Sequence, residues 1–257
     1  MPVLIGTSGW QYRDWRGTFY PGDLPQANWL EYYAERFQTQ EVNNAFYRLP
    51  EASTFTAWAE RAPDDFVMVV KASRFLTHIK RLKDPEEPVQ RFVERASCLG
   101  SKLGPVLLQL PPTMKADNER LDAALSLFPS DWRLAVEFRH ETWHTAETCD
   151  VLRSHGAAWC MADSTKRTVP AWTTAEWGYL RFHDGTGTPR PCYTKGRLDR
   201  WVGTLAELFP PEADVFVFFN NDPRGCAVYD ARVFAALCAK HGLEPTRVPG
   251  EKISVVR

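Results

Sequence analysis

The chain has 257 residues, of which 44% are hydrophobic and 25% are charged, a composition typical of a globular protein. Its longest apolar runs, such as residues 66–70 and 215–219, are far shorter than the roughly 20 residues that a membrane-spanning helix needs. With 31 Lys and Arg against 32 Asp and Glu, the net charge is -1, which excludes the overall basic surface typical of nonspecific DNA binders.

Eight short runs with apolar or alternating patterns predict β-strands. In chain order they are residues 3–6, 41–47, 66–71, 106–110, 134–138, 158–162, 179–182 and 215–220. Between the strands, apolar residues recur at i, i+3, i+4 and i+7, which predicts amphipathic helices. These helical patterns lie at residues 30–37, 55–62, 89–96, 121–128, 198–205 and 234–241.

This alternation predicts an α/β fold: a single (β/α)8 TIM-like barrel domain over residues 1–257, with parallel strands inside an outer ring of helices. No stretch of the chain has the composition of a linker between domains. A doubly wound open sheet is the alternative, but no GxGxxG motif follows the first predicted strand.

The sequence has six cysteines, with no CxxC pair and no clustered Cys/His spacing: Cys98, Cys149, Cys160, Cys192, Cys226 and Cys238. We therefore expect neither a structural zinc site nor a disulfide framework, and interpret most of these thiols as small buried side chains in a reducing compartment. The N-terminus lacks the basic and apolar pattern of a secretory signal. These observations predict a cytoplasmic protein that does not associate with membranes.

Polar side chains gather near the predicted carboxyl ends of the strands, where the active sites of barrels lie. Because strand side chains alternate between two faces, Glu137 shares a face with Arg139, while Phe138 faces the helices. The polar residues expected to converge in the barrel mouth are Glu41, Asn43, Lys71, Gln109, Glu137, Arg139, Asp163, Arg181, His183 and Asn220. Burying unpaired charge costs several kcal/mol, so these groups must pair with one another, bind a ligand, or do both.

Two interpretations of this polar set remain open. In the first, its three carboxylates and three cations neutralise one another in a rigid internal network. In the second, they form a functional site with shifted pKa values. Removal of Lys71 alone is expected to leave a carboxylate uncompensated, at a cost of about 3 kcal/mol if the carboxylate is fully buried.

The segments that follow the strands are rich in basic residues: Arg74, His78, Lys80, Arg81, Lys166, Arg167, Arg190, Lys195 and Arg197. Their shared side predicts a positive rim that favours an anionic ligand. Tryptophans in or near the same segments could stack a sugar or a base, or simply anchor the loops: Trp10, Trp15, Trp143, Trp172 and Trp177. Residues 184–196, which are rich in Gly and Pro, are a candidate lid.

Residues 140–144 (HETWH) match the HExxH pattern of zinc proteases, in which both histidines lie one turn apart on a helix. Here His140 directly follows a predicted strand, so the helix that the motif needs is not expected. We therefore predict no zinc at this motif and no cofactor, and expect His140 to point into the pocket.

Several motifs, in order along nearly the whole chain, carry a family resemblance. They are residues 5–10 (IGTSGW) with Trp15 and 19–21 (FYP), 41–47 (EVNNAFY), Lys71, 108–112 (LQLPP), 137–140 (EFRH) with Trp143, Asp163, 181–183 (RFH) and 219–221 (FNN). With these motifs the sequence resembles the YecE-like family, also called domain of unknown function 72. The resemblance implies a TIM-like barrel and brings no established activity. Asp184, where the family tends to have Gly, and Asp222, where it often has His, depart from the pattern.

The leading hypothesis is an enzyme that uses general acid–base chemistry on a small anionic or polyhydroxylated substrate, such as a sugar phosphate or a nucleotide fragment. Glu137 is the expected general acid or base, His183 the second proton-transfer group, and Lys71 a catalytic cation. The expected substrate-binding residues are Glu41, Asn43, Tyr47, Gln109, Arg139, His140, Trp143, Asp163, Arg181, Asn220, Asn221 and Trp10. We expect sulfate, phosphate or a carboxylate to bind near Arg139 and Arg181.

Two alternatives come from other classes of protein. One is a barrel that binds or processes nucleic acid, with at most one divalent metal, since similar barrels include sugar isomerases and metal-dependent endonucleases that act at abasic DNA sites. The other is a noncatalytic ligand-binding or partner protein. Nucleic acid is the less favoured partner, and the sequence indicates no oligomeric state.

Overall fold

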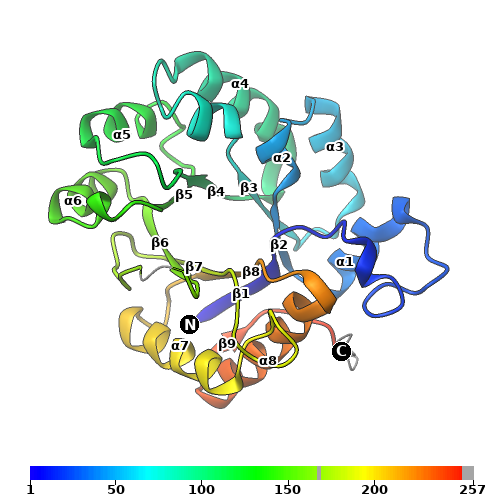
Figure 1. Ribbon diagram of the computed structural model, residues 1–257. Helices are drawn as coiled ribbons and strands as arrows, with labels where there is room; N and C mark the ends of the chain where they lie inside the picture. The colour runs from blue at the N-terminus through cyan, green and yellow to red at the C-terminus, as the bar shows by residue number, and fades with distance from the viewer. Residues whose placement is uncertain (167–168, 251–257) are drawn as a thin grey trace.

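The computed structural model describes residues 1–166 and 169–250, and all nine strands within them belong to one sheet. The strand order is β2-β3-β4-β5-β6-β7-β8-β1-β9, and every neighbouring pair is parallel. The strands are β1 (Pro2–Thr7), β2 (Thr39–Val42), β3 (Val67–Lys71), β4 (Leu103–Gln109), β5 (Leu134–Glu137), β6 (Ala158–Asp163), β7 (Gly178–Phe182), β8 (Val215–Phe219) and β9 (Glu244–Pro245). The sheet curls into an incomplete barrel (Figure 1).

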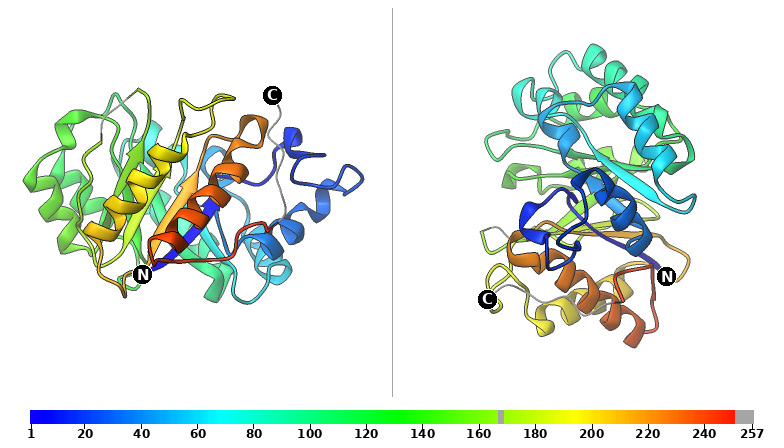
Figure 2. Two further views of the ribbon diagram at one scale, coloured as in Figure 1. Left: turned by 90° about the horizontal axis from the view of Figure 1, so that it is seen from below. Right: turned by 90° about the vertical axis from the view of Figure 1, so that its right-hand side faces the viewer.

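Helices cover the outside of the curled sheet, as Figure 1 shows along the strands and Figure 2 from two sides. They are α1 (Trp29–Arg36), α2 (Asn44–Tyr47), α3 (Ala52–Arg61), α4 (Glu86–Ala96), α5 (Asn118–Leu125), α6 (Ala146–Ser154), α7 (Lys195–Leu208) and α8 (Cys226–Lys240). One apolar core lies between the helices and the sheet, and a smaller one fills the interior of the barrel. Among the described residues, no helix has the length and apolar character needed to cross a membrane.

The expectation of a closed eight-stranded barrel is wrong, because β1 and β2 do not form a ladder. The amino end of β1 pairs instead with β9. Further along, the Tyr33 hydroxyl accepts from the Thr7 N–H at 2.9 Å and contacts the Thr39 carbonyl oxygen at 3.3 Å. Only a single parallel bridge, between Ser8 and Glu41, joins the two edges at their carboxyl ends. A tyrosine side chain and β9 thus take the hydrogen-bonding positions that a closed barrel would give to β2.

The second strand is shorter than its sequence pattern predicts. It spans Thr39–Val42, and the residues expected to continue it form α2 (Asn44–Tyr47). Asn43 and Asn44 explain the break, because asparagine side chains compete for backbone hydrogen bonds and favour turns and helix starts. As a result Tyr47 stands on a short helix at the edge of the barrel mouth, with 79% of its surface exposed.

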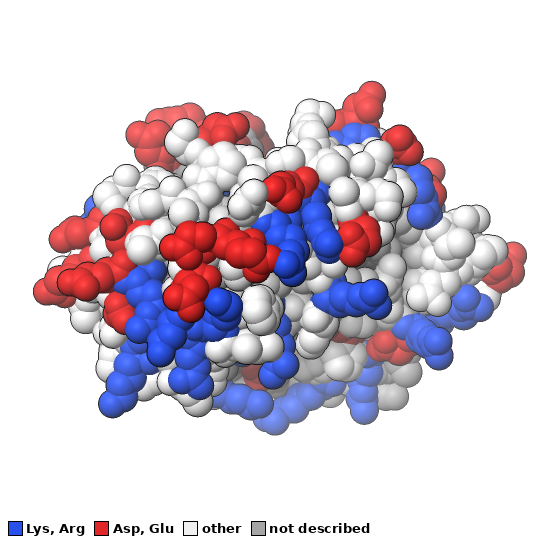
Figure 3. Space-filling view, turned by 90° about the horizontal axis from the view of Figure 1, so that it is seen from above, with Lys and Arg blue, Asp and Glu red and all other residues white. Residues whose placement is uncertain are grey.

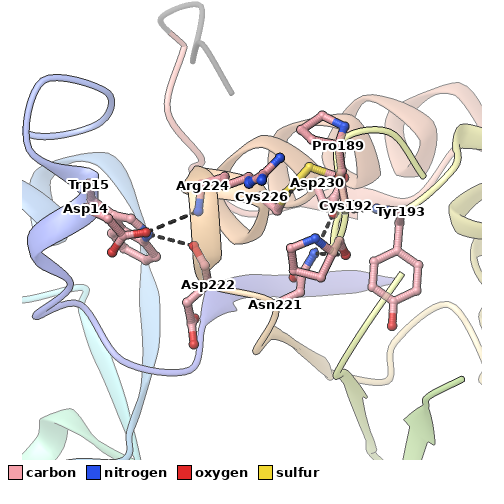
Figure 4. The surroundings of a disulfide bond; sticks show 11 residues. Asp14, Trp15, Pro189, Cys192, Tyr193, Asn221, Asp222, Arg224, Cys226 and Asp230 are labelled. Atoms are coloured by element: carbon pink, nitrogen blue, oxygen red, sulfur yellow. Dashed lines mark hydrogen bonds between the residues drawn. A yellow bond between two sulfur atoms is a disulfide. The ribbon is translucent and has the colours of Figure 1, made fainter. Parts of the chain in front are cut away.

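The sequence predicts no disulfide framework and free thiols for most of the six cysteines, but two of them are joined in a disulfide. Cys192, in the loop after β7, forms a disulfide with Cys226 at the start of α8 (Figure 4). In the same region Asn221 Nδ2 donates to the Pro191 carbonyl oxygen at 3.1 Å and to Asp230 Oδ2 at 2.7 Å. The candidate lid is therefore fastened to α8 both covalently and by hydrogen bonds. Sequence spacing gave no sign of this pair because the two cysteines are 34 residues apart, one in the loop after β7 and the other at the first position of α8.

Candidate functional site

The strand residues that face the barrel interior change from apolar to polar toward the carboxyl ends. Deep in the barrel lie side chains such as Val69, Leu107 and Ala135. Two residues further along the same strands come Lys71, Gln109 and Glu137, all of which are buried. This order follows from the two-residue period of a strand, and it places a polar layer directly above an apolar one.

Glu137 is the centre of the polar layer. Its Oε2 accepts from Gln109 Nε2 at 2.8 Å and from Arg181 Nη1 at 2.5 Å. Its Oε1 accepts from Arg139 Nε at 3.1 Å and lies 3.1 Å from His183 Nε2. Both oxygens of this carboxylate are therefore occupied by partners from four other positions of the chain.

Arg181 links the Glu137 carboxylate to a second one, that of Glu41. Its Nη2 donates to Glu41 Oε1 at 2.7 Å, and Glu41 Oε2 accepts from the Tyr179 hydroxyl at 2.6 Å. Arg181 is only 1% exposed, so its guanidinium has no open side for a ligand. Glu41, Glu137 and Arg181 thus neutralise one another in an internal network, the first of the two interpretations. An anion could bind to Arg181 only if the contacts with these two carboxylates were broken.

The electrostatics of this network make Glu137 a weak base. Burial alone would raise the pKa of Glu137, but the charges of Arg181 and Arg139 and the hydrogen bond from His183 together hold it well below its ordinary value. The two carboxylates keep the pKa of Arg181 well above its ordinary value in spite of burial. A carboxylate so strongly stabilised in its ionised form holds cations in place more readily than it exchanges protons.

His183 is also fully engaged. Its Nε2 faces Glu137, and its Nδ1 lies 3.3 Å from the amide nitrogen of Asn220. Burial lowers the pKa of His183 more than Glu137 raises it, so the ring is neutral at neutral pH. The contacts fit a tautomer with the proton on Nε2, which leaves neither ring nitrogen free to transfer a proton.

Lys71 lies at the end of β3, and its surroundings differ from those of Arg181. Its ammonium lies 4.1 Å from the centre of the Phe46 ring, and no carboxylate of the described residues lies within ion-pair distance of it. Burial, together with the positive charge of Arg181, lowers the pKa of Lys71 to about 7. At neutral pH this amine is thus divided between its charged and its neutral forms.

The expectation that Lys71 compensates a buried carboxylate is therefore wrong. Removal of Lys71 should stabilise the folded protein rather than destabilise it. Lys71→Met should raise the free energy of unfolding at pH 6, on the order of 2 kcal/mol after loss of the contact with Phe46, because it removes a buried ammonium. The folded pKa lies below the ordinary value of 10.5, so this penalty is full below pH 7 and is relieved as the pH rises toward 10.5. Urea unfolding at pH 6 and at pH 9.5 measures the difference; a variant that is less stable than the parent protein at pH 6 would contradict this assignment.

A cavity of about 650 Å³ opens at the carboxyl ends of the strands, above the polar layer. Its wall includes three cationic side chains, those of Lys71, Arg74 and Arg139. The ring of His78 also lines it, and burial together with the charge of Lys71 lowers the pKa of His78 to about 4, so this ring is neutral. Asp222 is the acidic side chain in the wall, and burial raises its pKa to about 7. The lining is therefore positive at and below neutral pH.

On the side of the molecule seen in Figure 3, basic side chains gather toward this end of the barrel. The lower edge of Figure 3 corresponds to the side that faces the viewer in Figure 1, where the carboxyl ends of the strands lie. Lys and Arg side chains gather along that edge, whereas most Asp and Glu side chains lie above it. Arg167, one of the residues expected in the basic rim, lies outside the described residues.

Of the predicted site residues, a subset lines the cavity itself: Asn43, Tyr47, Lys71, Gln109, Arg139 and Asn220. Glu41, Glu137, Arg181 and His183 lie in the network that holds this wall. His140 is half-buried, and its Nδ1 accepts from the Thr142 N–H at 3.2 Å at the start of a 3-10 turn, Glu141–Trp143. The HExxH motif therefore lacks its helix, as the sequence predicts.

Four other predicted site residues lie away from the cavity. Asp163 faces α7, where it pairs with Arg197 at 2.8 Å and accepts from Trp201 Nε1 at 2.6 Å. Asn221 fastens the loop after β7 to Asp230.

Trp10 packs edge-on against Trp58, and Trp143 is fully buried and stacks on Phe138. These two tryptophans anchor loops. The nucleic-acid alternative thus loses two of the side chains that could have stacked bases.

Sequence reasoning missed five residues of the cavity wall: Gly9, Gln11, Tyr12, Asn44 and Phe46. It considered Arg74 and His78 only as parts of the rim, and Asp222 only as a departure from the family pattern. These residues lie in loops or in short helical turns, where no periodicity shows which way a side chain points. Phe75–Ile79, which contains His78, is a π-helical turn, a feature frequent at functional sites.

These observations define a barrel-like α/β protein with a positively lined cavity at the carboxyl ends of its strands. The model of the family "Protein of unknown function DUF72" matches residues 4–252, and the chain belongs to this family. The resemblance found in the sequence is thereby confirmed.

Relatives and solved structures agree with this assignment. UPF0759 protein YunF of Bacillus subtilis is 28% identical over 88% of this chain and 90% of its own length. UPF0759 protein YecE of Escherichia coli is 32% identical over 54% of this chain and 48% of its own length. The crystal structure of a DUF72 family protein from Thermotoga maritima is similar with a TM-score of 0.81 and 29% identity, covering 93% of this chain and 100% of the other.

Proposed function

We propose that this protein is an enzyme that binds a small anionic or polyhydroxylated substrate in the cavity at the barrel mouth and acts on it by general acid–base chemistry. The observation that carries the proposal is the pairing state of Lys71, which faces the cavity without a carboxylate partner among the described residues. An unpaired, nearly buried amine in a cavity wall needs a counterion when it is charged and can accept a proton when it is neutral.

The roles of the other groups follow from their partners. Arg74 and Arg139 add positive charge to the wall, and Arg139 is held by Glu137 through its Nε only. Guanidinium groups match phosphate and carboxylate oxygens with directed hydrogen bonds. Glu137, itself held by Arg181, positions Arg139, and Lys71 takes the role of proton acceptor that the sequence assigned to Glu137. Among the described residues no group of three His, Cys, Asp or Glu side chains is arranged to hold a metal ion, and the proposal uses none.

Sulfate tests the binding half of the proposal, because its charge is constant over the relevant pH range. Its affinity should fall about tenfold between pH 6 and pH 8 as Lys71 loses its proton and Asp222 gains a negative charge. Lys71→Met should weaken sulfate binding at pH 6 by more than tenfold, and the remaining pH dependence of the affinity should be due to Asp222 alone. In the Lys71→Met, Asp222→Asn double variant, sulfate affinity should therefore not depend on pH. Isothermal titration calorimetry measures each affinity.

Arg91→Ala is the matched control, because Arg91 is an exposed cation on α4 that pairs with Glu87 and lies outside the cavity wall. It should bind sulfate as the parent protein does. Equal affinity in the parent protein and in Lys71→Met at pH 6 would refute the proposed site.

A further inference from the structure

The wall of the cavity divides into two chemically different halves along the order of the strands. The cations lie on one half, since Lys71 and Arg74 follow β3 and Arg139 follows β5. The other half is formed by the loops after β8, β1 and β2, which carry Asp222, Tyr12 and Asn43. Because β8 pairs with β1, and Ser8 bridges β1 to Glu41 of β2, these three loops are neighbours. A ligand that fills the cavity therefore meets positive charge on one side only.

The second half presents two buried acceptor atoms, and the Asp222 carboxyl group also has a hydrogen bond with the side chain of Tyr12. Asn43 Oδ1 and Asp222 Oδ1 are buried without a hydrogen-bond partner among the described residues. Buried acceptors are rarely left unsatisfied, and the terminal torsions of Asn and Asp rotate easily enough to bring either oxygen to the cavity surface. The Tyr12 hydroxyl beside them donates to the Ser8 carbonyl oxygen at 2.5 Å. This half of the wall thus requires donors from a ligand.

Further side chains of the wall are suited to hydroxyl groups. Four more carboxamides line it: Gln11, Asn44, Gln109 and Asn220. An amide offers both donors and an acceptor, which is the combination that a hydroxyl group needs. Tyr47, which is 79% exposed, presents an aromatic face at the cavity edge, where the apolar face of a sugar-like chain can pack.

We propose that the ligand of this cavity is a phosphorylated or carboxylated polyol, with its anionic group against Lys71, Arg74 and Arg139 and its hydroxyl groups donating to Asn43 and Asp222. This inference rests on the proposed function and deepens it. It places the anionic group and the hydroxyl groups in one ligand molecule, which binds in one orientation. The orientation follows from the division of the wall, since neither half alone satisfies both kinds of group.

Two phosphate esters of equal charge test the inference by calorimetry at pH 6. D-Sorbitol 6-phosphate carries the hydroxyl groups and has no carbonyl group that could react with Lys71, whereas methyl phosphate carries none. The protein should bind sorbitol 6-phosphate at least tenfold more tightly than methyl phosphate, because several hydrogen bonds are added. Asn43→Ala and Asp222→Asn should each remove most of this advantage, whereas Arg74→Ala should weaken both esters by the same factor.

Asp150→Asn is the matched control for Asp222→Asn, because it also removes one carboxylate, but Asp150 is exposed on α6, where it pairs with Arg153, and lies outside the cavity wall. Asn43→Ala, on a different loop, keeps the test valid if Asp222→Asn does not fold. Equal affinity for the two esters would overturn the polyol inference and leave the proposed anion site standing. Sorbitol that binds as tightly as sorbitol 6-phosphate would likewise overturn the inference, because the anionic group would then contribute nothing, whereas a failure of sorbitol and of both esters to bind would refute the proposed function.

Discussion

Arg181→Met should lower the free energy of unfolding by about 3–5 kcal/mol at pH 7 to 8, a larger loss than any other single substitution considered for this protein. Arg181 donates to Glu41 and to Glu137, and all three side chains are buried. Without the guanidinium, Glu41 keeps only the Tyr179 hydroxyl among these partners, and a carboxylate left in the interior without its cation is very unfavourable. Urea unfolding of the parent protein and the variant measures this loss.

The loss should depend on pH in a defined direction. The folded-state pKa of Glu137 is depressed, so the stability it contributes is present above its ordinary value of 4.5 and is lost as the pH falls through the folded value. In Arg181→Met this contribution shrinks, and the buried carboxylates then favour their protonated forms. The difference between the two proteins is therefore greatest at neutral and alkaline pH and decreases toward pH 4.

Two further variants separate charge from packing. Glu41→Gln in the Arg181→Met background should recover part of the lost stability, because a neutral amide no longer needs the cation. Arg91→Met, which breaks an exposed pair with Glu87 one turn away on α4, should cost no more than about 0.5 kcal/mol. If Arg181→Met were no more costly than Arg91→Met, the buried network would not be what holds the cavity wall.

The polar layer could be predicted from the sequence because it depends on local rules alone. Side chains two residues apart share a face of a strand, and parallel strands bring their carboxyl ends to one side. These rules placed Lys71, Gln109 and Glu137 together. The same period also explains one wrong placement: Asp163 continues the outward series of Trp159 and Met161, and so it faces a helix.

Other features depend on contacts between distant segments and leave no periodic trace. The opening between β1 and β2 depends on the hydroxyl of Tyr33, which forms hydrogen bonds with the backbone of both strands. In the sequence, Tyr33 of α1 indicates only one position of an apolar helix face. The acceptors of the cavity wall lie in the loops after β1, β2 and β8, whose backbone turns decide where each side chain points. The sequence predicted that the partners of Glu137 converge in the barrel mouth. Their individual pKa values, however, depend on which nitrogen atom forms a hydrogen bond with which oxygen atom.

Removal of the disulfide should produce the second large effect. Cys192 and Cys226 are separated by 34 residues, and a cross-link over a loop of this length restricts the unfolded chain enough to stabilise the folded state by about 4 kcal/mol. The double variant Cys192→Ser, Cys226→Ser should therefore unfold at a lower urea concentration than the parent protein. Incubation with a phosphine reductant should have the same effect on the parent protein and no effect on the double variant.

Cys98→Ser is the control, since Cys98 is an unpaired and partly exposed thiol. It should change the stability little, and a thiol assay of the denatured, unreduced protein should count the four cysteines that are not bridged. A count of six would show that the bridge does not form.

The effect on the cavity should be small, in contrast to the effect on stability. The loop after β7 stays attached to α8 through hydrogen bonds that do not involve sulfur, since Asp230 Oδ2 accepts from the Tyr193 N–H at 2.9 Å and from Asn221 Nδ2 at 2.7 Å. Figure 4 shows these contacts beside the bridge, with the Asp222 side chain pointing away from the sulfur atoms. Because the bridge acts mainly on the unfolded chain, sulfate affinity at pH 6 should be the same in the parent protein and in the double variant. A large loss of sulfate binding with the bridge removed would mean that the covalent link, rather than the Asn221–Asp230 contact, holds the β8 side of the cavity wall in place.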